Sequence, residues 1–255
     1  MADTPILISA AVAEEVSGII RTLRFAQTHI AGRRQIVTGR LNDKTVSVLV
    51  TGPGQVNTAQ ALTAAIECVR PSLIIQTGCG GAYRESGLVV GDIAVAVEEI
   101  DAHLGIENPD SGIAHDDLPF SVARSDTLEI KNRYPICPER VDAALAVLKP
   151  MMAPAGVHCM KGAFLTVSTL TATDQRAADL YRIYKACMEN MEGAAAAHVA
   201  VHYGVPLVEV RSVSNRVGKR DLHRWNLPLA FERIATVIPA IVQHDETGRL
   251  IETLD

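Results

Sequence analysis

Two charged residues stand where an unpaired charge would be costly, and they are the first candidates for chemistry. Glu192 lies where a predicted strand gives way to a predicted helix, and Arg211 lies inside the apolar segment 206–213. Burying a charge without a partner is strongly unfavourable, so each requires a partner or a ligand. Two structural alternatives stay open: the two residues pair with each other, or Glu192 occupies a first helical turn where the dipole favours it.

A second candidate is a glycine cluster that follows the short predicted strand 72–76. Thr77-Gly78-Cys79-Gly80-Gly81-Ala82 lies at the carboxyl end of that strand, where open α/β sheets bind ligands, and we expect a ligand site there. For the earlier run Gly52-Pro53-Gly54, a tight turn between sheet and helix is a serious competitor. Neither run completes a dinucleotide fingerprint, because Asn57 and Tyr83 occupy the places of the third glycine. No Gly-Lys-Ser/Thr follows either run, so a P-loop is also excluded.

The elements that must position these residues alternate between strand and helix patterns. The sequence predicts a single α/β domain over residues 1–255, with a mixed central sheet flanked by helices and a polar tail at 244–255. A long loop is expected at 101–119. The expected strands are 6–11, 35–41, 45–50, 72–76, 88–99, 157–168 and 206–213, and the expected helices are 12–27, 56–69, 125–133, 138–148, 174–185, 194–203 and 228–243.

Composition limits the classes of function. The chain has 255 residues, 48% of them hydrophobic, which is enough to bury a large core in one domain. A net charge of −5 argues against nucleic acid as a partner, since the local basic cluster 216–224 is not a stripe. No apolar run reaches the length of a membrane span, so no membrane partner is expected. Five widely spaced cysteines without a C-x-x-C pair suggest neither a disulfide framework nor a zinc ribbon, and a cytoplasmic location is expected.

A metal site is not expected. His198 and His202 lie four residues apart on one helix face, but the zincin pattern needs a glutamate where Val199 stands. Ordinary helix-face histidines are therefore preferred.

Several separated motifs together resemble one family. In chain order they match the nucleosidases that cleave methylthioadenosine and adenosylhomocysteine, within the purine nucleoside phosphorylase superfamily, over nearly the whole chain. This resemblance implies a nucleoside phosphorylase-like fold, a small-molecule nucleoside substrate and no cofactor. It also implies a homodimer or higher homo-oligomer, in which a neighbour's loop such as 101–119 lies over the site. The motifs are Ala10-Ala11-Val12-Ala13-Glu14-Glu15-Val16, Thr77-Gly78-Cys79-Gly80-Gly81, Val90-Gly91-Asp92-Ile93, Gly162-Ala163-Phe164, Asn190-Met191-Glu192-Gly193 and Val210-Arg211-Ser212-Val213-Ser214-Asn215.

One departure points to a branch of the family. In the adenosine-cleaving nucleosidases, the strand that carries the arginine corresponding to Arg211 ends in Ser-Asp, whereas here it ends in Ser214-Asn215. That ending resembles the futalosine hydrolases of menaquinone biosynthesis, which release hypoxanthine. A carboxylate would repel the 6-oxo group of hypoxanthine, while asparagine donates to O6 and accepts from N7–H. A buried polar mismatch costs about 1–3 kcal/mol, so Asp versus Asn is a plausible purine selector. The alternative is that Asn215 is a simple turn residue.

The resemblance also implies residue roles. Glu15 resembles the base that activates water, with the alternative of a helix-surface carboxylate, a role that Glu14 fits better. Arg211 resembles the arginine beside that water, and Cys79 replaces the family's serine there, as a weaker donor. A catalytic thiolate is not expected, because attack by water needs no covalent cysteine. Glu192 would bind the ribose hydroxyls, Met191 would pack on the sugar, and Phe164 with the Leu165 backbone would hold the purine, unless Phe164 is ordinary core. Gly80, Gly81 and Ser214 complete the expected substrate-binding set.

Three rivals remain. A methylthioadenosine/adenosylhomocysteine nucleosidase would release adenine, a purine nucleoside phosphorylase would need phosphate, and a nucleoside sensor would bind without turnover. The charge of Glu15 would repel phosphate, which favours hydrolysis. Futalosine carries an acidic aromatic extension, for which a cation is expected unless the charge run is simply solvated. The candidates are Arg216, Lys219, Arg220, His223, Arg224, His103 and His115.

Overall fold

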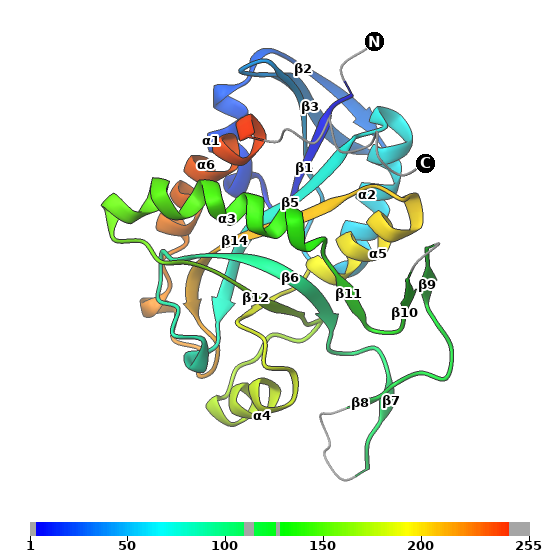
Figure 1. Cartoon of the computed structure of the whole chain (residues 1–255), viewed down its shortest axis with the longest axis vertical. Coiled ribbons are helices and arrows are strands. Elements are labelled where there is room, and N and C mark those ends of the chain that lie inside the picture. The colour runs from blue at the N-terminus through cyan, green and yellow to red at the C-terminus, as the bar shows by residue number, and fades with distance from the viewer. Residues whose placement is uncertain (1–3, 110–114, 126–127, 245–255) are drawn as a thin grey trace.

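The structure is a computed structural model that describes residues 4–109, 115–125 and 128–244 (Figure 1). The strands are β1 (Ile6–Ala10), β2 (Arg24–Ala31), β3 (Arg34–Leu41), β4 (Lys44–Val50), β5 (Leu73–Ala82), β6 (Ile93–Asp101), β7 (Ile106–Glu107), β8 (His115–Asp116), β9 (Ala123–Arg124), β10 (Glu129–Ile130), β11 (Arg133–Pro135), β12 (Cys159–Thr166), β13 (Met188–Asn190) and β14 (Leu207–Arg216). The α-helices are α1 (Ala13–Thr22), α2 (Gln55–Val69), α3 (Pro138–Met152), α4 (Asp174–Tyr184), α5 (Gly193–Tyr203) and α6 (Leu227–His244). Short 3₁₀ turns lie at Arg84–Ser86, Ala153–Ala155 and Leu222–Arg224.

A mixed central sheet organises the described residues. Its strand order is β11-β6-β12-β13-β5-β1-β4-β3-β2, and β14 pairs with both β5 and β6. The β14 pairing is parallel to β5 and antiparallel to β6. Because β13 also pairs with β5, the strands β5, β14, β6, β12 and β13 form a closed ring of pairings. The expected mixed sheet is confirmed, and the ring brings the ends of β5, β13 and β14 together.

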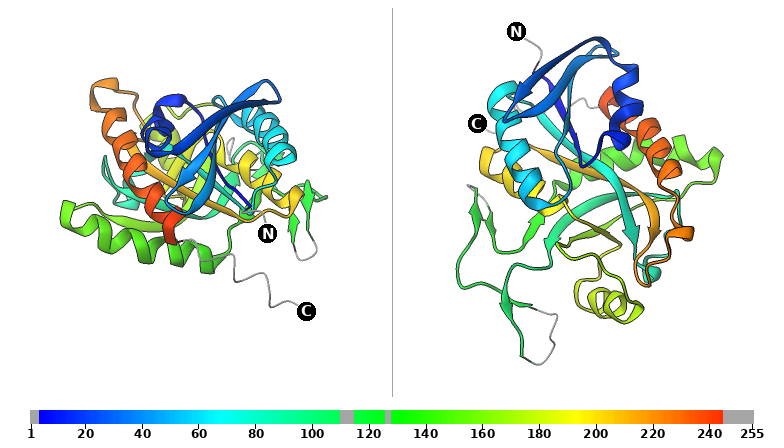
Figure 2. Two further views of the ribbon diagram at one scale, coloured as in Figure 1. Left: turned by 90° about the horizontal axis from the view of Figure 1, so that it is seen from above. Right: turned by 180° about the vertical axis from the view of Figure 1, so that it is seen from behind.

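Helices cover both faces of the sheet (Figures 1 and 2). Helices α1, α3 and α6 pack together on one face, and α2 packs against α5 on the other. The start of α5 lies very close to the sheet because it begins with Gly193 and four alanines. A Cβ on Gly193 would lie 1.9 Å from Glu99 Oε1, so only glycine fits there.

The amino-terminal helix is shorter than expected. The sequence predicts a helix over 12–27, but α1 ends at Thr22 and β2 follows at once. Val16 and Ile19 are buried on its inner face. The apolar pattern continues past Leu23, and a strand forms because β3 offers it an antiparallel partner, which local periodicity does not reveal.

Three other segments also differ from expectation. The helix expected over 125–133 is wrong, because Glu129–Ile130 and Arg133–Pro135 are strands. The strand expected over 88–99 begins only at Ile93, since the Asp92 carboxylate closes a turn by accepting from Val89 N–H at 2.9 Å. The glycines expected in a loop lie within β5 itself. The expected loop 101–119 carries β7 and β8, and its residues 110–114 lie outside the described part, as does most of the polar tail.

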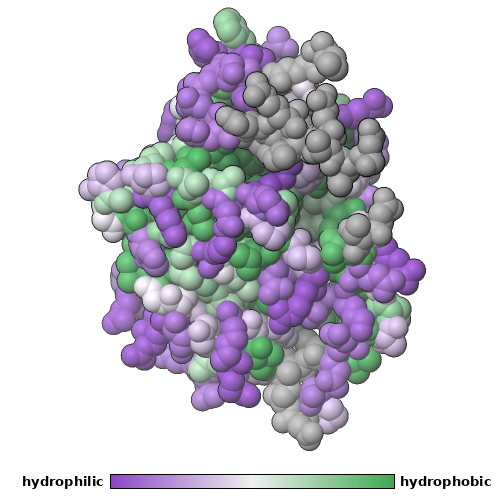
Figure 3. Space-filling view, in the orientation of Figure 1, coloured by the Kyte–Doolittle hydropathy of each residue, from purple (hydrophilic) through white to green (hydrophobic). Residues whose placement is uncertain are grey.

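Hydrophilic side chains cover most of the face shown in Figure 3, with apolar residues gathered along α3. No helix in the described ranges is both long and apolar enough to cross a membrane.

Candidate active site

Glu15 lies in the first turn of α1 with its carboxylate buried. Oε2 accepts from Ala11 N–H at 3.0 Å, and Oε1 accepts from Cys79 N–H at 2.9 Å. Burial raises the pKa of Glu15, while the Cys79 N–H and the charge of Arg211 oppose the rise. A carboxylate with a raised pKa suits proton abstraction near neutral pH. Glu14 is exposed, so the surface role that the sequence offered belongs to Glu14.

The glycines of β5 make room for two polar side chains. A Cβ at Gly78, whose φ of +142° favours glycine, would lie 2.5 Å from Glu15 Oε1. A Cβ at Gly81 would lie 3.2 Å from Asn215 Nδ2. One strand therefore approaches the candidate base at one point and the candidate purine selector three residues later.

Arg211 is buried on β14, and each of its three side-chain nitrogens donates a hydrogen bond within the protein. Its Nε donates to Glu209 Oε1 at 2.7 Å, its Nη1 to the Cys79 carbonyl at 2.9 Å, and its Nη2 to Glu192 Oε2 at 3.3 Å. The structure shows the first of the two alternatives that the sequence left open, because Arg211 and Glu192 pair with each other. The guanidinium thus ties β14 to β5 and to the start of α5.

Glu192 joins the site to the Gly52–Gly54 turn. Its Oε1 accepts from Gly54 N–H at 2.9 Å, and its Oε2 accepts from Arg211. Gly54 has a φ of +89°, a conformation that favours glycine. The turn therefore positions a carboxylate. Met191, the residue before it, is partly buried against the cluster that includes Leu165.

Cys79 is a neutral thiol. Burial and the negative charge of Glu15 together raise its pKa to about 12. Because the thiolate is the reactive form, Cys79 is unsuited to nucleophilic catalysis.

The burial pattern predicts selective alkylation. Brief treatment of the folded protein with iodoacetamide at pH 8 should label the exposed Cys68 and Cys137 and spare Cys79, Cys159 and Cys187. Peptide mass spectrometry measures the extent at each site. Labelling of Cys79 as fast as Cys68 would contradict the neutral, buried thiol, and full labelling in denaturant is the control.

Asn215 lies near the end of β14 beside Ser214. The single Ser214 hydroxyl proton can go to Asn215 Oδ1 at 2.8 Å or to the Gly80 carbonyl at 3.2 Å. Asn215 Nδ2 donates one hydrogen to the Arg216 carbonyl at 3.1 Å and has a second for a ligand. The Ser214 hydroxyl and the Arg216 carbonyl are thus the groups that orient the amide.

Asn215 and the expected Gly81 line an inner cavity together with Trp225. Three further wall residues, Leu170, Thr171 and Glu189, were not singled out by the sequence. Two features of the sequence could have indicated these wall residues. They are the threonine-rich stretch before α4 and the first glutamate of Glu189-Asn190-Met191-Glu192. Long-range packing brings them together, because Glu189 Oε2 accepts from Thr171 Oγ1 at 2.6 Å.

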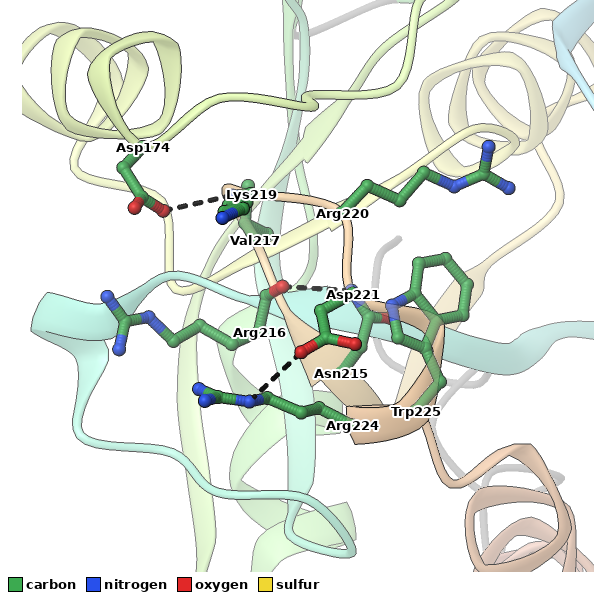
Figure 4. Close-up of a pocket in the computed structure, with 9 residues that line it drawn as sticks. All are labelled: Asp174, Asn215, Arg216, Val217, Lys219, Arg220, Asp221, Arg224 and Trp225. Atoms are coloured by element: carbon green, nitrogen blue, oxygen red, sulfur yellow. Dashed lines mark hydrogen bonds and ion pairs between the residues drawn. The ribbon is translucent and has the colours of Figure 1, made fainter.

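An outer cavity of about 520 Å³ adjoins the inner one and carries most of the candidate cations (Figure 4). Arg224 pairs with Asp221 at 3.3 Å, and Arg220 lies 5.8 Å from the Trp225 ring centroid. Arg216, Arg220 and Trp225 line both cavities. Elsewhere, His103 Nδ1 accepts from Ser168 N–H at 3.2 Å, and the His115 side chain lies outside the described part. The candidate cations lining the outer cavity are Arg216, Lys219, Arg220 and Arg224.

Phe164 and Leu165 are not brought to these cavities. Both side chains are fully buried, Phe164 in the main core and Leu165 in the smaller cluster near α4. The position of Phe164 agrees with the alternative that it is an ordinary core residue. Leu170 and Thr171, five and six residues after Leu165, occupy the cavity wall instead.

Behind Arg211 lies a second buried acidic pair, Glu99 and Glu209. Glu99 accepts from Asn190 Nδ2 and Thr166 Oγ1, both at 2.7 Å. Burial and the neighbouring Glu209 raise the pKa of Glu99 well above its usual range. Burial also raises the pKa of Glu209, while the charge of Arg211 opposes that rise. Because Glu209 forms the ion pair with Arg211 at 2.7 Å, we expect a proton of this acidic pair to reside on Glu99.

This proton assignment predicts unequal effects of two glutamine variants. Glu99→Gln should cost about 1 kcal/mol, because the group is already neutral and only the bond from Asn190 is lost. Glu209→Gln should cost on the order of 3 kcal/mol, since it removes a buried counterion of Arg211. Urea unfolding at pH 7 measures both. Equal losses would mean that Glu99 is also charged.

Comparisons with known proteins agree on one protein family. The model of the phosphorylase superfamily matches residues 5–243. A futalosine hydrolase of Acidothermus cellulolyticus is 35% identical over 92% of this chain and 89% of its own, and one of Thermus thermophilus is 31% identical over 79% and 83%. A solved methylthioadenosine/S-adenosylhomocysteine nucleosidase of Colwellia psychrerythraea, in complex with adenine, superposes with a TM-score of 0.80 at 20% identity, covering 95% of this chain and 96% of that one. At that identity, the likeness bears on the fold.

Proposed function

Because the chain belongs to the phosphorylase superfamily, we propose that it hydrolyses the N-glycosidic bond of futalosine, releasing hypoxanthine and dehypoxanthine futalosine in menaquinone biosynthesis. The observation that carries the proposal is Asn215 on the wall of the inner cavity, within a chain that is 35% identical to a futalosine hydrolase. Asparagine matches a 6-oxopurine, because its amide N–H donates to O6 and its carbonyl accepts from N7–H.

Water is the proposed nucleophile. Glu15 takes a proton from the water, the water oxygen bonds to the ribosyl carbon, and the bond to the base breaks with its electron pair going to the base. The departing hypoxanthine takes up a proton from solvent, because an asparagine amide supplies none at neutral pH. Glu192 binds the ribose hydroxyls, and Met191 packs on the sugar.

Phosphorolysis is disfavoured by the charges around Arg211. All three of its nitrogens donate to protein acceptors, two of them carboxylates. The nearby Glu15 carboxylate adds further negative charge. Phosphate binding wants free cations and N–H donors, so this arrangement supports water over phosphate.

The test is base release, followed by chromatography, from futalosine, inosine, methylthioadenosine and adenosylhomocysteine, each with and without phosphate. Hypoxanthine from futalosine, at a rate indifferent to phosphate, is the expected result. Adenine release or a requirement for phosphate would overturn the proposal in favour of another branch of the superfamily.

Arg220 is the proposed partner of the acidic aromatic end of futalosine, because it lies where the inner and outer cavities join and, unlike Arg216, is placed over the Trp225 ring. Arg220→Gln should raise KM for futalosine about tenfold, the loss expected for one solvent-accessible charged hydrogen bond. It should leave KM for inosine, which lacks the extension, nearly unchanged. Arg224→Gln is the matched control, since Arg224 is paired with Asp221 at 3.3 Å. An equal change in KM for both substrates would reject Arg220 as the partner of the acidic end.

We also propose self-association through the face formed by α2 and α5. An apolar hollow there is lined by Val56, Ala59, Val122 and Ala195, and Val56 is 86% exposed. Covering such a surface with a second copy of the chain would bury apolar area. Sedimentation of the wild type and Val56→Glu tests this, and an unchanged monomer in both would contradict it.

A further inference from the structure

Glu189 is a buried acidic residue that the proposed hydrolysis does not use. It lies on β13 with 5% of its surface exposed, and it lines the inner cavity together with Asn215. Three residues farther on, Glu192 belongs to the Arg211 network, so the two carboxylates point to different places. A buried acid on the wall of a cavity raises the question of what it binds there.

Every protein group that contacts the Glu189 carboxylate is a donor. Oε2 accepts from the Tyr83 hydroxyl at 3.0 Å and from Thr171 Oγ1 at 2.6 Å, and Oε1 accepts from Thr171 N–H at 3.1 Å. Burial and the nearby charge of Glu189 raise the pKa of Tyr83, which keeps its hydroxyl protonated and donating. These donors fix the side chain in a single position.

The carboxylate retains capacity for one more donor. A carboxylate has about four acceptor positions, and the groups in the described ranges fill two on Oε2 and one on Oε1. The remaining position on Oε1 belongs to a side chain that lines the cavity. An N–H group of a ligand is the donor that would fill this acceptor position.

The two purine classes differ at the edge that would meet this acceptor. A 6-oxopurine carries an N1–H donor beside its O6 acceptor, whereas a 6-aminopurine carries an N1 acceptor beside its amino donor. Asn215 supplies a donor for O6, and Glu189 supplies an acceptor for N1–H. The same carboxylate would repel the N1 lone pair of adenine.

We propose that Glu189 is a second base-selecting residue, which accepts a hydrogen bond from N1–H of the 6-oxopurine while Asn215 contacts its O6 and N7. The proposal rests on the proposed function, because it assumes that the base occupies the inner cavity. It makes selection depend on two residues of opposite hydrogen-bonding character, placed on β13 and β14.

Product inhibition tests the N1–H contact directly. Hypoxanthine and 1-methylhypoxanthine differ in having or lacking the N1 hydrogen, so the ratio of their inhibition constants reports on its partner. The wild type should favour hypoxanthine by at least about tenfold. Glu189→Met, of similar size but without an acceptor, should bring the ratio to within about threefold. Glu189→Gln, which keeps a carbonyl oxygen, should restore part of it.

Two outcomes would overturn the proposal: a wild-type ratio near one, or an unchanged ratio in Glu189→Met, which would mean that the methyl group is excluded by shape alone. If Glu189→Met fails to fold, the wild-type ratio and the Glu189→Gln ratio still decide. Tyr83→Phe is a control, because it removes one donor to Glu189 and leaves the acceptor in place. Failure of the proposed function would appear separately, as wild-type protein that releases no hypoxanthine from futalosine.

Discussion

Replacing Glu15 by glutamine should lower kcat for hypoxanthine release by about 10²- to 10⁴-fold, the usual contribution of a positioned general base. The loss follows from geometry, because both carboxylate oxygens accept from backbone N–H groups and the charge lies beside Arg211. Steady-state kinetics should show the change in kcat, with substrate binding altered by only a few-fold. Near-normal turnover would mean that the base is elsewhere.

The neighbouring residue provides a matched control. Glu14→Gln makes the same chemical change one residue earlier on the exposed side of α1, and its kcat should equal that of the wild type. The thermal unfolding of both variants should be measured as well. In Glu15→Gln, an amide NH₂ in place of one carboxylate oxygen would face a backbone N–H donor, which could lower stability. A loss of activity with an intact fold separates catalysis from stability.

The raised pKa of Glu15 also fixes the direction of the pH dependence. A general base works when deprotonated, so kcat/KM for the wild type should fall as the pH drops through the raised pKa. The acid limb should therefore lie above the ordinary range of a glutamate. In Glu15→Gln this limb should disappear from the residual activity.

Replacing Asn215 by aspartate should shift base preference from hypoxanthine toward adenine by about 10- to 100-fold in the ratio of kcat/KM values. An aspartate would repel O6 of a 6-oxopurine and accept from the amino group of adenine. Ser214 would still donate to the new carboxylate, so the side chain should keep its orientation. The measurement compares base release from futalosine and from its 6-amino counterpart.

Asn226→Asp is the control for this charge change. Asn226 is exposed, and its Oδ1 accepts from Leu229 N–H at 3.1 Å, a bond that aspartate retains. Its base preference should match that of the wild type. An unchanged preference in Asn215→Asp would remove Asn215 as a selector and leave Glu189 to be tested alone.

Much of the fold follows from local pattern. The helices α2, α3, α4, α5 and α6 and the hairpin of β3 and β4 lie close to the predicted ranges, because their periodicity is strong over many residues. The pattern was wrong where strand pairing decided the outcome, as in β2 and in the segment Glu129–Pro135. There a strand partner overrides weak helical propensity: the adjacent hairpin strand for β2 and β10, and the more distant β6 for β11.

The sequence by itself determined which residues demanded explanation. A glutamate at a strand-to-helix junction, an arginine within an apolar strand and the Ser214-Asn215 ending are readable as residue types in context, because burying charge without a partner is costly. The tertiary structure decided their partners. Arg211 meets the Cys79 carbonyl and Glu192 only because β14 pairs with β5 and α5 begins beside them, whereas Glu209 is its neighbour two residues earlier on β14.

The walls of the cavity were likewise decided by the tertiary structure. Phe164 and Leu170 are both apolar and only six residues apart, yet Phe164 is fully buried in the core while Leu170 lines the inner cavity. Glu189 reaches the same cavity because β13 pairs with β5 at Gly81. Local sequence gives each side chain its chemistry, whereas the closed ring of strand pairings decides which side chains meet, because the pairings of β5 with β13 and β14 join residues more than a hundred positions apart.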